Sequence, residues 1–70
     1  MLEEIFLEII GLTELPENFE TLGMGDIETW DSLANFNLLL ALEDHLGVRF
    51  SVDEISTLTS IKALRTRLNL

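Results

Sequence analysis

Side chains that could carry out catalysis are few in this sequence and are not spaced for it. The only histidine is His45, and the chain has no cysteine, so neither a thiol nucleophile nor a cysteine-ligated metal can form. Neighbouring acids such as Glu43 and Asp44 point to different sides of a helix, which is typical of solvated charge. The other acids lack the spacing of a calcium-binding loop, and no glycine-rich phosphate loop occurs. We therefore expect no catalytic residue, no metal site and no enzymatic activity.

One short motif does carry chemistry, and it is Trp30-Asp31-Ser32-Leu33. A serine in the first turn of a helix exposes its hydroxyl beside backbone N–H groups that have no partner within the helix. A phosphate attached to Ser32 would be stabilised by these N–H groups and by the positive end of the helix dipole. The alternative interpretation is a plain helix cap followed by a core leucine. The choice between the two depends on the elements that position the motif.

Hydrophobic periodicity and capping residues predict four helices, so the expected fold class is all-α. The first helix is amphipathic and ends at Gly11. Its apolar stripe consists of Leu2, Ile5, Phe6, Ile9 and Ile10. From Leu12 to Trp30 the periodicity disappears, which predicts a long loop. Large apolar residues should pin this loop to the core and keep it ordered: Leu15, Phe19, Leu22, Ile27 and Trp30.

The second helix is predicted from Ser32 to Leu46, with Asp31 or Ser32 as its cap and Gly47 as its stop. Leucines and a phenylalanine occur around most of its circumference, so we expect the other helices to wrap it. One strip of small and polar residues should remain open, formed by Ala34, Asn37, Ala41 and Asp44.

Two shorter helices follow. Ser51 and Glu54 have the spacing of a capping box, which predicts a short third helix through Ile55 to Leu58. Ser60 can cap a last helix that turns apolar residues inward and basic residues outward. The inward residues are Ile61, Leu64 and Leu68, and the outward ones are Lys62, Arg65 and Arg67. The three bases either neutralise the acidic body of the molecule or bind a partner, and we favour neutralisation.

Length and charge limit the possible functions. A chain of 70 residues, 47% hydrophobic and 24% charged, predicts a single domain over residues 1–70. Thirteen acids against four Lys and Arg give a net charge of −9, the opposite of the basic surface that nucleic acids require. The longest apolar run is too short to span a membrane, and the acidic N-terminal segment is unlike a signal peptide. We therefore expect a cytoplasmic monomer that binds no nucleic acid and inserts into no membrane.

From about residue 20 to residue 68 the sequence resembles an acyl carrier protein, without needing a gap. The likeness comprises Asp-Ser-Leu at the start of the long helix, Leu-Glu-Asp near its end, an apolar Phe50, and Asp53-Glu54 at the start of the third helix. The short first helix and the long loop are similar as well. The resemblance implies a four-helix carrier fold. It also implies that Ser32 receives 4'-phosphopantetheine from coenzyme A through a Mg²⁺-dependent phosphopantetheinyl transferase, with Asp31 and Leu33 as the flanking motif residues.

A carrier of this family performs no chemistry itself. It would hold an acyl or aminoacyl group as a thioester and present it to a loading ligase and to downstream synthases or transferases. The reactive sulfur would come from the prosthetic group, because the chain has no thiol. Fatty-acid carriers have glycines before the motif and acids along the exposed strip, whereas this chain has Trp30 and keeps only Glu43 and Asp44. The departure indicates a dedicated stand-alone carrier of a specialised lipid, polyketide or nonribosomal-peptide pathway.

The predicted partner surface combines the start of the long helix, its acidic end and the third helix. Its residues are Leu33, Ala34, Asn37, Glu43, Asp44, Ile55 and Leu58. The leucines at the middle and end of the long helix are interpreted as ordinary core, unless a cavity among them offers room for an acyl chain. The alternative function, from another class, is a small acidic helical adaptor that binds a partner helix or basic patch and carries no prosthetic group.

Overall fold

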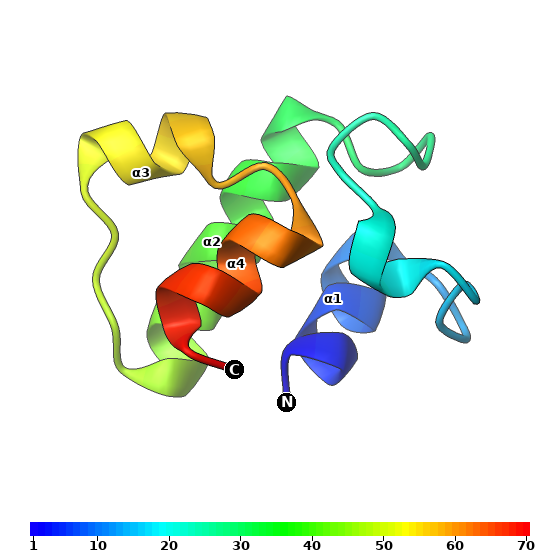
Figure 1. The fold of residues 1–70 in the computed structure, drawn as a ribbon, viewed down its shortest axis with the longest axis horizontal. Coiled ribbons are helices and arrows are strands. Elements are labelled where there is room, and N and C mark those ends of the chain that lie inside the picture. Colours follow the sequence, from blue (N-terminus) through cyan, green and yellow to red (C-terminus); the bar gives the residue numbers. More distant parts are fainter.

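Four α-helices and one turn of 3-10 helix make up residues 1–70 in the computed structural model (Figure 1). In chain order they are α1 (Leu2–Ile10), η1 (Phe19–Thr21), α2 (Ser32–Leu46), α3 (Val52–Thr57) and α4 (Ile61–Leu68). The chain has no β-strand, so the all-α class is confirmed. No helix has both the length and the apolar character that crossing a membrane requires.

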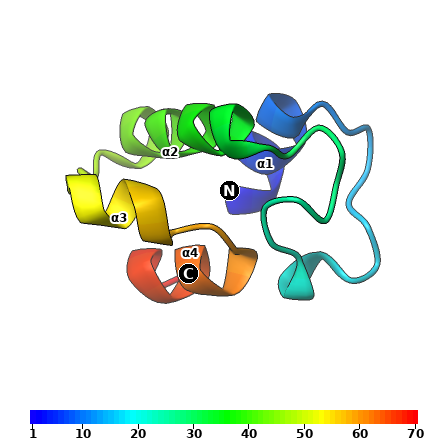
Figure 2. The same cartoon turned by 90° about the horizontal axis from the view of Figure 1, so that it is seen from above.

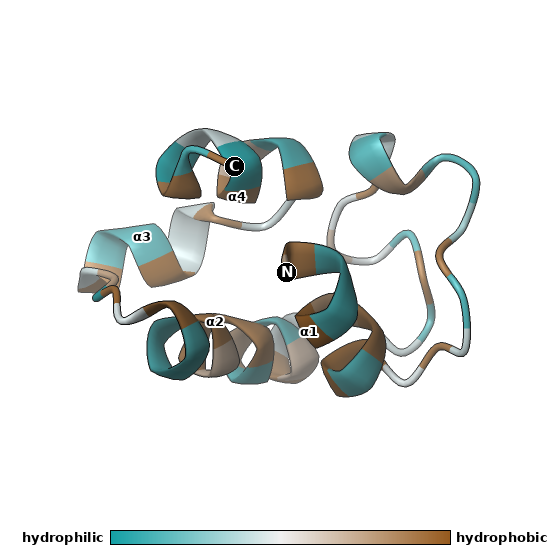
Figure 3. Ribbon diagram, turned by 90° about the horizontal axis from the view of Figure 1, so that it is seen from below, coloured by the Kyte–Doolittle hydropathy of each residue, from teal (hydrophilic) through white to brown (hydrophobic).

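The helices enclose one hydrophobic core. α1 and α2 pack against each other on one side, α4 lies opposite them, and α3 lies at one edge between α2 and α4 (Figure 2). Figure 3 shows the hydrophobic side of α4 turned toward α1 and α2 and its hydrophilic side turned away. The structure has no pocket among the helices, and Leu38, Leu39 and Leu42 of α2 are ordinary core, with Leu46 packed against it.

The first helix ends where its sequence indicates. Gly11 adopts a left-handed conformation with φ 85°, and its N–H donates to the carbonyl of Leu7. Four residues of the predicted apolar stripe are buried and Ile9 is half-buried; the buried ones are Leu2, Ile5, Phe6 and Ile10.

Aromatic side chains hold the long loop between α1 and α2 against the core. Phe6 of α1 makes edge-to-face contacts with Phe19, at 5.1 Å between ring centroids, and with Trp30, at 4.9 Å. Phe19 lies in η1, a turn that the sequence interpretation did not include. Leu15 was expected to pin the loop, but this is wrong: its side chain is exposed, because the segment around it runs over the surface before η1 begins.

Backbone hydrogen bonds dock the second half of the loop on the turn between α3 and α4. Met24 N–H donates to the carbonyl of Thr59 at 2.7 Å, and Ile61 N–H donates to the carbonyl of Leu22 at 3.0 Å. Gly23 forms an isolated antiparallel bridge with Ser60 in the same place. The loop is therefore ordered by main-chain pairing as well as by its apolar side chains.

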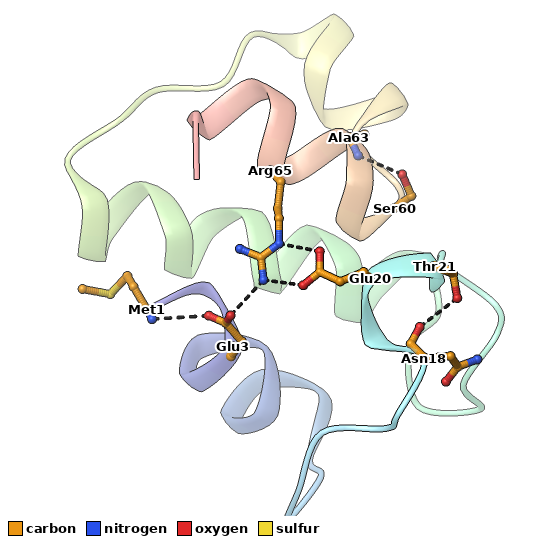
Figure 4. A network of polar contacts seen from close by, with 8 residues as sticks. All are labelled: Met1, Glu3, Asn18, Glu20, Thr21, Ser60, Ala63 and Arg65. Carbon is orange, nitrogen blue, oxygen red and sulfur yellow. Dashed lines mark hydrogen bonds and ion pairs between the residues drawn. The ribbon is translucent and has the colours of Figure 1, made fainter.

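Arg65 ties three separate segments together (Figure 4). Its guanidinium donates two hydrogen bonds to the Glu20 carboxylate, both at 2.6 Å, and one to Oε2 of Glu3 at 2.8 Å. The same guanidinium lies 5.9 Å from the ring centre of Phe19. Arg65 thus connects α4 to η1 and to α1, which accords with the expectation that basic residues of the last helix neutralise the acidic body.

The expectation that the other helices wrap α2 is wrong. Leu33, Phe36 and Leu40 are 68%, 42% and 45% exposed, whereas the buried residues of α2 are Asn35, Leu38, Leu39 and Leu42. The physical reason is length: α2 has 15 residues, and its shorter neighbours all pack on one of its sides. Of the strip expected to be open, Asn37 and Asp44 are exposed, but Ala34 and Ala41 are half-buried.

The two C-terminal helices begin at the predicted caps. Ser51 and Glu54 form a reciprocal capping box, although α3 begins at Val52 and ends at Thr57, so Leu58 follows the helix as its C-cap. Ser60 caps α4 by accepting a hydrogen bond from Ala63 N–H. Ile61 and Leu64 of α4 are fully buried, whereas α3 contains no buried residue.

Candidate functional site

Ser32 is the first residue of α2 and is exposed to solvent. The helix begins because Asp31 caps it: Oδ1 of Asp31 accepts the N–H of Ala34 at 2.8 Å, and its carbonyl accepts the N–H of Asn35 at 2.9 Å. Of the two caps considered, Asp31 is therefore the one used. The hydroxyl of Ser32 makes no hydrogen bond within the protein, and neither do the backbone N–H groups of Ser32 and Leu33.

Trp30 fixes the segment that enters the site. Its side chain is completely buried, and its indole N–H donates to Oδ1 of Asn35 at 3.0 Å. Its main chain is held as well, because its N–H donates to the carbonyl of Ile27 and its carbonyl accepts the N–H of Gly25. The interpretation of Trp30 as the residue that fixes the loop to the helix start agrees with this packing. Ser32 consequently lies two residues from a rigid anchor.

Asn35 is the one residue of this region whose importance the sequence interpretation missed. It is 3% exposed and is the only polar residue in the core. Its amide accepts from Trp30 and donates to the carbonyl of Leu58 at 3.0 Å, so both ends of the amide are paired. The signal was present in the sequence, since position 35 precedes Leu38, Leu39 and Leu42 by helical spacings and shares their face.

An apolar stripe runs along the open side of α2 from Ser32 onward. We define it as Leu33, Phe36 and Leu40, which recur at i, i+3 and i+7. Exposed polar and acidic residues lie on the same helix, among them Asn37 and Asp44. Single exposed leucines are common in proteins, whereas these three large apolar residues follow one another along one helix face.

The other predicted partner residues differ in how far they are exposed to solvent. Leu58 is only 7% exposed, so its assignment to a partner surface is a correction: it lies beneath α3 because the chain turns inward after Thr57. Glu43 is half-buried, and its Oε2 accepts the N–H of Phe50 at 2.8 Å, which supports the link between α2 and α3. Ile55 is half-buried. The α2 part of the predicted surface and its α3 part therefore do not form one continuous exposed patch.

An ion pair between Glu54 and Arg67 joins α3 to α4. The Glu54 carboxylate accepts the N–H of its cap residue Ser51 and also contacts the guanidinium of Arg67, and both interactions lower its pKa. Arg67 also lies 5.3 Å from the ring centre of Phe50 and donates to the carbonyl of Arg49 at 2.9 Å. These contacts attach the start of α3 to the end of α4.

His45 is exposed in the last turn of α2, far along the helix from Ser32. No three His, Asp or Glu side chains are grouped as metal ligands would be. Comparison with known proteins found no matching family, no matching curated protein and no matching solved structure. The function is therefore inferred from the site itself.

Proposed function

We propose that this protein is a carrier that holds its cargo on a prosthetic arm attached through Ser32. More particularly, we propose a stand-alone acyl or aminoacyl carrier protein, bearing 4'-phosphopantetheine, that serves a specialised lipid, polyketide or nonribosomal-peptide pathway. The observation that carries the proposal is the open Ser32 hydroxyl at the first position of the longest helix, two residues after a buried tryptophan. The resemblance of residues 20–68 to acyl carrier proteins adds to it.

The residues around Ser32 fit a phosphate ester. The backbone N–H groups of Ser32 and Leu33 are without acceptors, and the positive end of the α2 dipole faces the same point. Asp31 is committed to capping the helix, so the carboxylate nearest to the serine in sequence is held by the Ala34 N–H. When attached, phosphopantetheine would supply the thiol that this cysteine-free chain lacks. The protein's part is to hold and present the arm.

The apolar stripe suits the enzymes that would act on such a cargo. It begins at Leu33, next to the attachment site, and continues away from it through Phe36 and Leu40. Partner enzymes with an apolar ridge flanked by Lys or Arg would match both the stripe and the acidic body. Such partners include the phosphopantetheinyl transferase, the loading ligase and the synthases or transferases that receive the cargo.

The alternative proposal, an acidic adaptor without a prosthetic group, uses the same stripe. An apolar helix face of this kind could bind a partner helix directly. It gives no role to the unpaired Ser32 hydroxyl or to the tryptophan that fixes the preceding segment. Sensitivity of the chain to coenzyme A and a transferase separates the two functions.

The deciding experiment is the intact mass of the protein before and after incubation with coenzyme A, Mg²⁺ and a broad-specificity phosphopantetheinyl transferase. We expect the wild-type protein to gain one phosphopantetheine and fragmentation to locate it on Ser32. Ser32→Ala should abolish the gain while leaving helical content and melting nearly unchanged, because the helix cap is Asp31 and not Ser32.

A matched control is available in Ser56, an exposed helical serine outside the motif. Ser56→Ala should load as the wild type does. Loading of the Ser32→Ala protein would show that the attachment site is elsewhere. Failure of the wild type to load with several transferases would favour the adaptor.

A further inference from the structure

A buried chain of hydrogen bonds connects the segment before Ser32 to the end of α3. The indole N–H of Trp30 donates to Asn35, and the amide N–H of Asn35 donates to the carbonyl of Leu58, each at 3.0 Å. Three segments meet at this one side chain, and Asn35 and Leu58 are 23 residues apart in sequence. We call the set of Trp30, Asn35 and Leu58 the buried relay.

The presence of an asparagine at this position calls for a reason other than packing. The other fourteen buried residues are all apolar, and an apolar side chain of similar size would fill the same place but would leave the Trp30 indole N–H and the Leu58 carbonyl without their partner. What only the amide can do is accept from one neighbour and donate to another at the same time. Asn35 therefore makes the positions of Trp30 and Leu58 depend on each other.

α3 is attached to the rest of the molecule at its two ends and, in its middle, through the half-buried Ile55, which packs against the core. None of its residues is buried. Its start is held by the Glu43 contact to Phe50 and by the Glu54–Arg67 ion pair, and its end is held by the Asn35 contact to Leu58. An element with few buried contacts opens at lower free energy than the core does, so α3 is the helix most readily displaced.

We propose that Asn35 is a positioning residue that couples α3 to the start of α2. A displacement of α3, by a partner or by cargo, pulls on the Leu58 carbonyl and is transmitted through the Asn35 amide to Trp30, two residues before Ser32. The coupling is inferred from the buried relay and does not depend on the proposed function. The effect of the coupling on loading of Ser32 deepens the proposed function and rests on that function.

The coupling can be measured by destabilising α3 with a substitution that lies away from the buried relay. Ser51→Ala removes the hydroxyl that accepts the N–H of Glu54 at 3.1 Å, at an exposed position that does not touch the relay. The reporter is amide hydrogen exchange at residue 30, whose N–H is bonded to the carbonyl of Ile27. With Asn35 present, we expect Ser51→Ala to speed this exchange by about threefold to tenfold.

In an Asn35→Leu background the same Ser51→Ala change should speed exchange at residue 30 much less, because only the backbone bonds between Met24 and Thr59 and between Gly25 and Trp30 still connect the two segments. The Leu58 N–H, bonded to Glu54, should still exchange faster. Asn37→Leu is the matched control, because Asn37 is an exposed asparagine on the same helix and should keep the coupling intact. If Asn35→Leu does not fold, Trp30→Phe removes the indole N–H and cuts the relay at its other end. An equal response in the Asn35→Leu and Asn37→Leu backgrounds would overturn the proposal.

A second measurement tests the consequence for the site. The rate at which a transferase modifies Ser32 should change with Ser51→Ala when Asn35 is present, and it should change much less in the Asn35→Leu protein. Absence of modification in every protein, wild type included, would contradict the proposed function and leave the exchange result standing. Modification rates that respond to Ser51→Ala equally in both backgrounds would contradict the coupling alone.

Discussion

At the scale of single residues, the ion pair between Arg65 and Glu3 has a definite dependence on pH. The hydrogen bond from Arg65 is the main cause that lowers the pKa of Glu3 from its ordinary 4.5 to about 2. The two Glu20 hydrogen bonds, followed by the one to Glu3, raise the pKa of Arg65, so the guanidinium stays charged throughout. A carboxyl whose pKa is lowered by folding adds stability above its unfolded pKa and loses that stability as the pH falls through its folded pKa.

Glu3→Gln should therefore lower the stability of the protein near pH 7. Because the Glu3 side chain is 38% exposed, we expect a cost of only about 0.5–1 kcal/mol, at the upper end of the range for surface pairs. The difference between variant and wild type should be constant above about pH 5 and should shrink as the pH falls toward 2. Denaturant titrations at a series of pH values measure this difference.

The neighbouring Glu4 provides the control for this prediction. Glu4 is 87% exposed and pairs only with the N-terminal amine, so Glu4→Gln should have little effect at any pH. A Glu3→Gln cost that persists unchanged at pH 2.5 would show that Glu3 acts through something other than its charge.

At the scale of elements, α2 has two apolar sides, one buried in the core and the other exposed to solvent. Leu39 is 2% exposed on the core side, whereas Phe36 is 42% exposed on the stripe. Leu39→Ala should cost about 2–5 kcal/mol, and Phe36→Ala should cost less than about 1 kcal/mol although it removes more atoms. Urea denaturation followed by circular dichroism measures both. Similar costs for the two variants would mean that the stripe is covered in solution.

Helix ends were the most predictable part of the fold. Gly11, Gly47, the Ser51–Glu54 capping box and Ser60 all act as their local sequence indicates, because a cap depends on residues within a few positions. The orientation of α2 was not predictable in this way. Its leucines occur on every side, so the buried side is chosen by where the neighbouring helices lie, and no local pattern contains that information.

For the candidate site, too, local features were predictable from the sequence and contacts between distant segments were not. The place of Ser32 at the helix start and the anchoring by Trp30 followed from the motif and from the break in periodicity. The burial of Leu58 and the half-burial of Ala34 were missed, since both depend on how the elements pack around the common core. The link from Asn35 to Leu58 spans 23 residues, which is beyond the reach of local sequence patterns.

At the scale of the whole molecule, the charge of −9 opposes folding. Residues 1–48 contain eleven of the thirteen acids and no Lys or Arg, and only Arg65 and Arg67 of the later bases form side-chain ion pairs. Screening by salt weakens this repulsion over distances beyond about 10 Å at 0.1 M, while hydrogen-bonded pairs such as Arg65–Glu20 are screened less.

Added sodium chloride should therefore raise the melting temperature. We expect a rise of a few degrees between about 0.01 M and 0.3 M salt, measured by the loss of helical circular dichroism. The same rise should not occur with an uncharged osmolyte matched in osmolarity. A melting temperature that falls with salt would mean that the ion pairs of Arg65 and Arg67 contribute more than the repulsion of the remaining acids.

The acidic charge also affects the solubility of the protein, because the apolar stripe on α2 is exposed. At the isoelectric point, which the sequence places near pH 4.1, the net charge vanishes, and molecules that each expose Leu33, Phe36 and Leu40 are no longer kept apart. Precipitation should then begin at the stripe, among chains that are still folded, and dilution into neutral buffer should redissolve them. The acidic surface thus keeps the protein dispersed at neutral pH while a hydrophobic helix face stays uncovered.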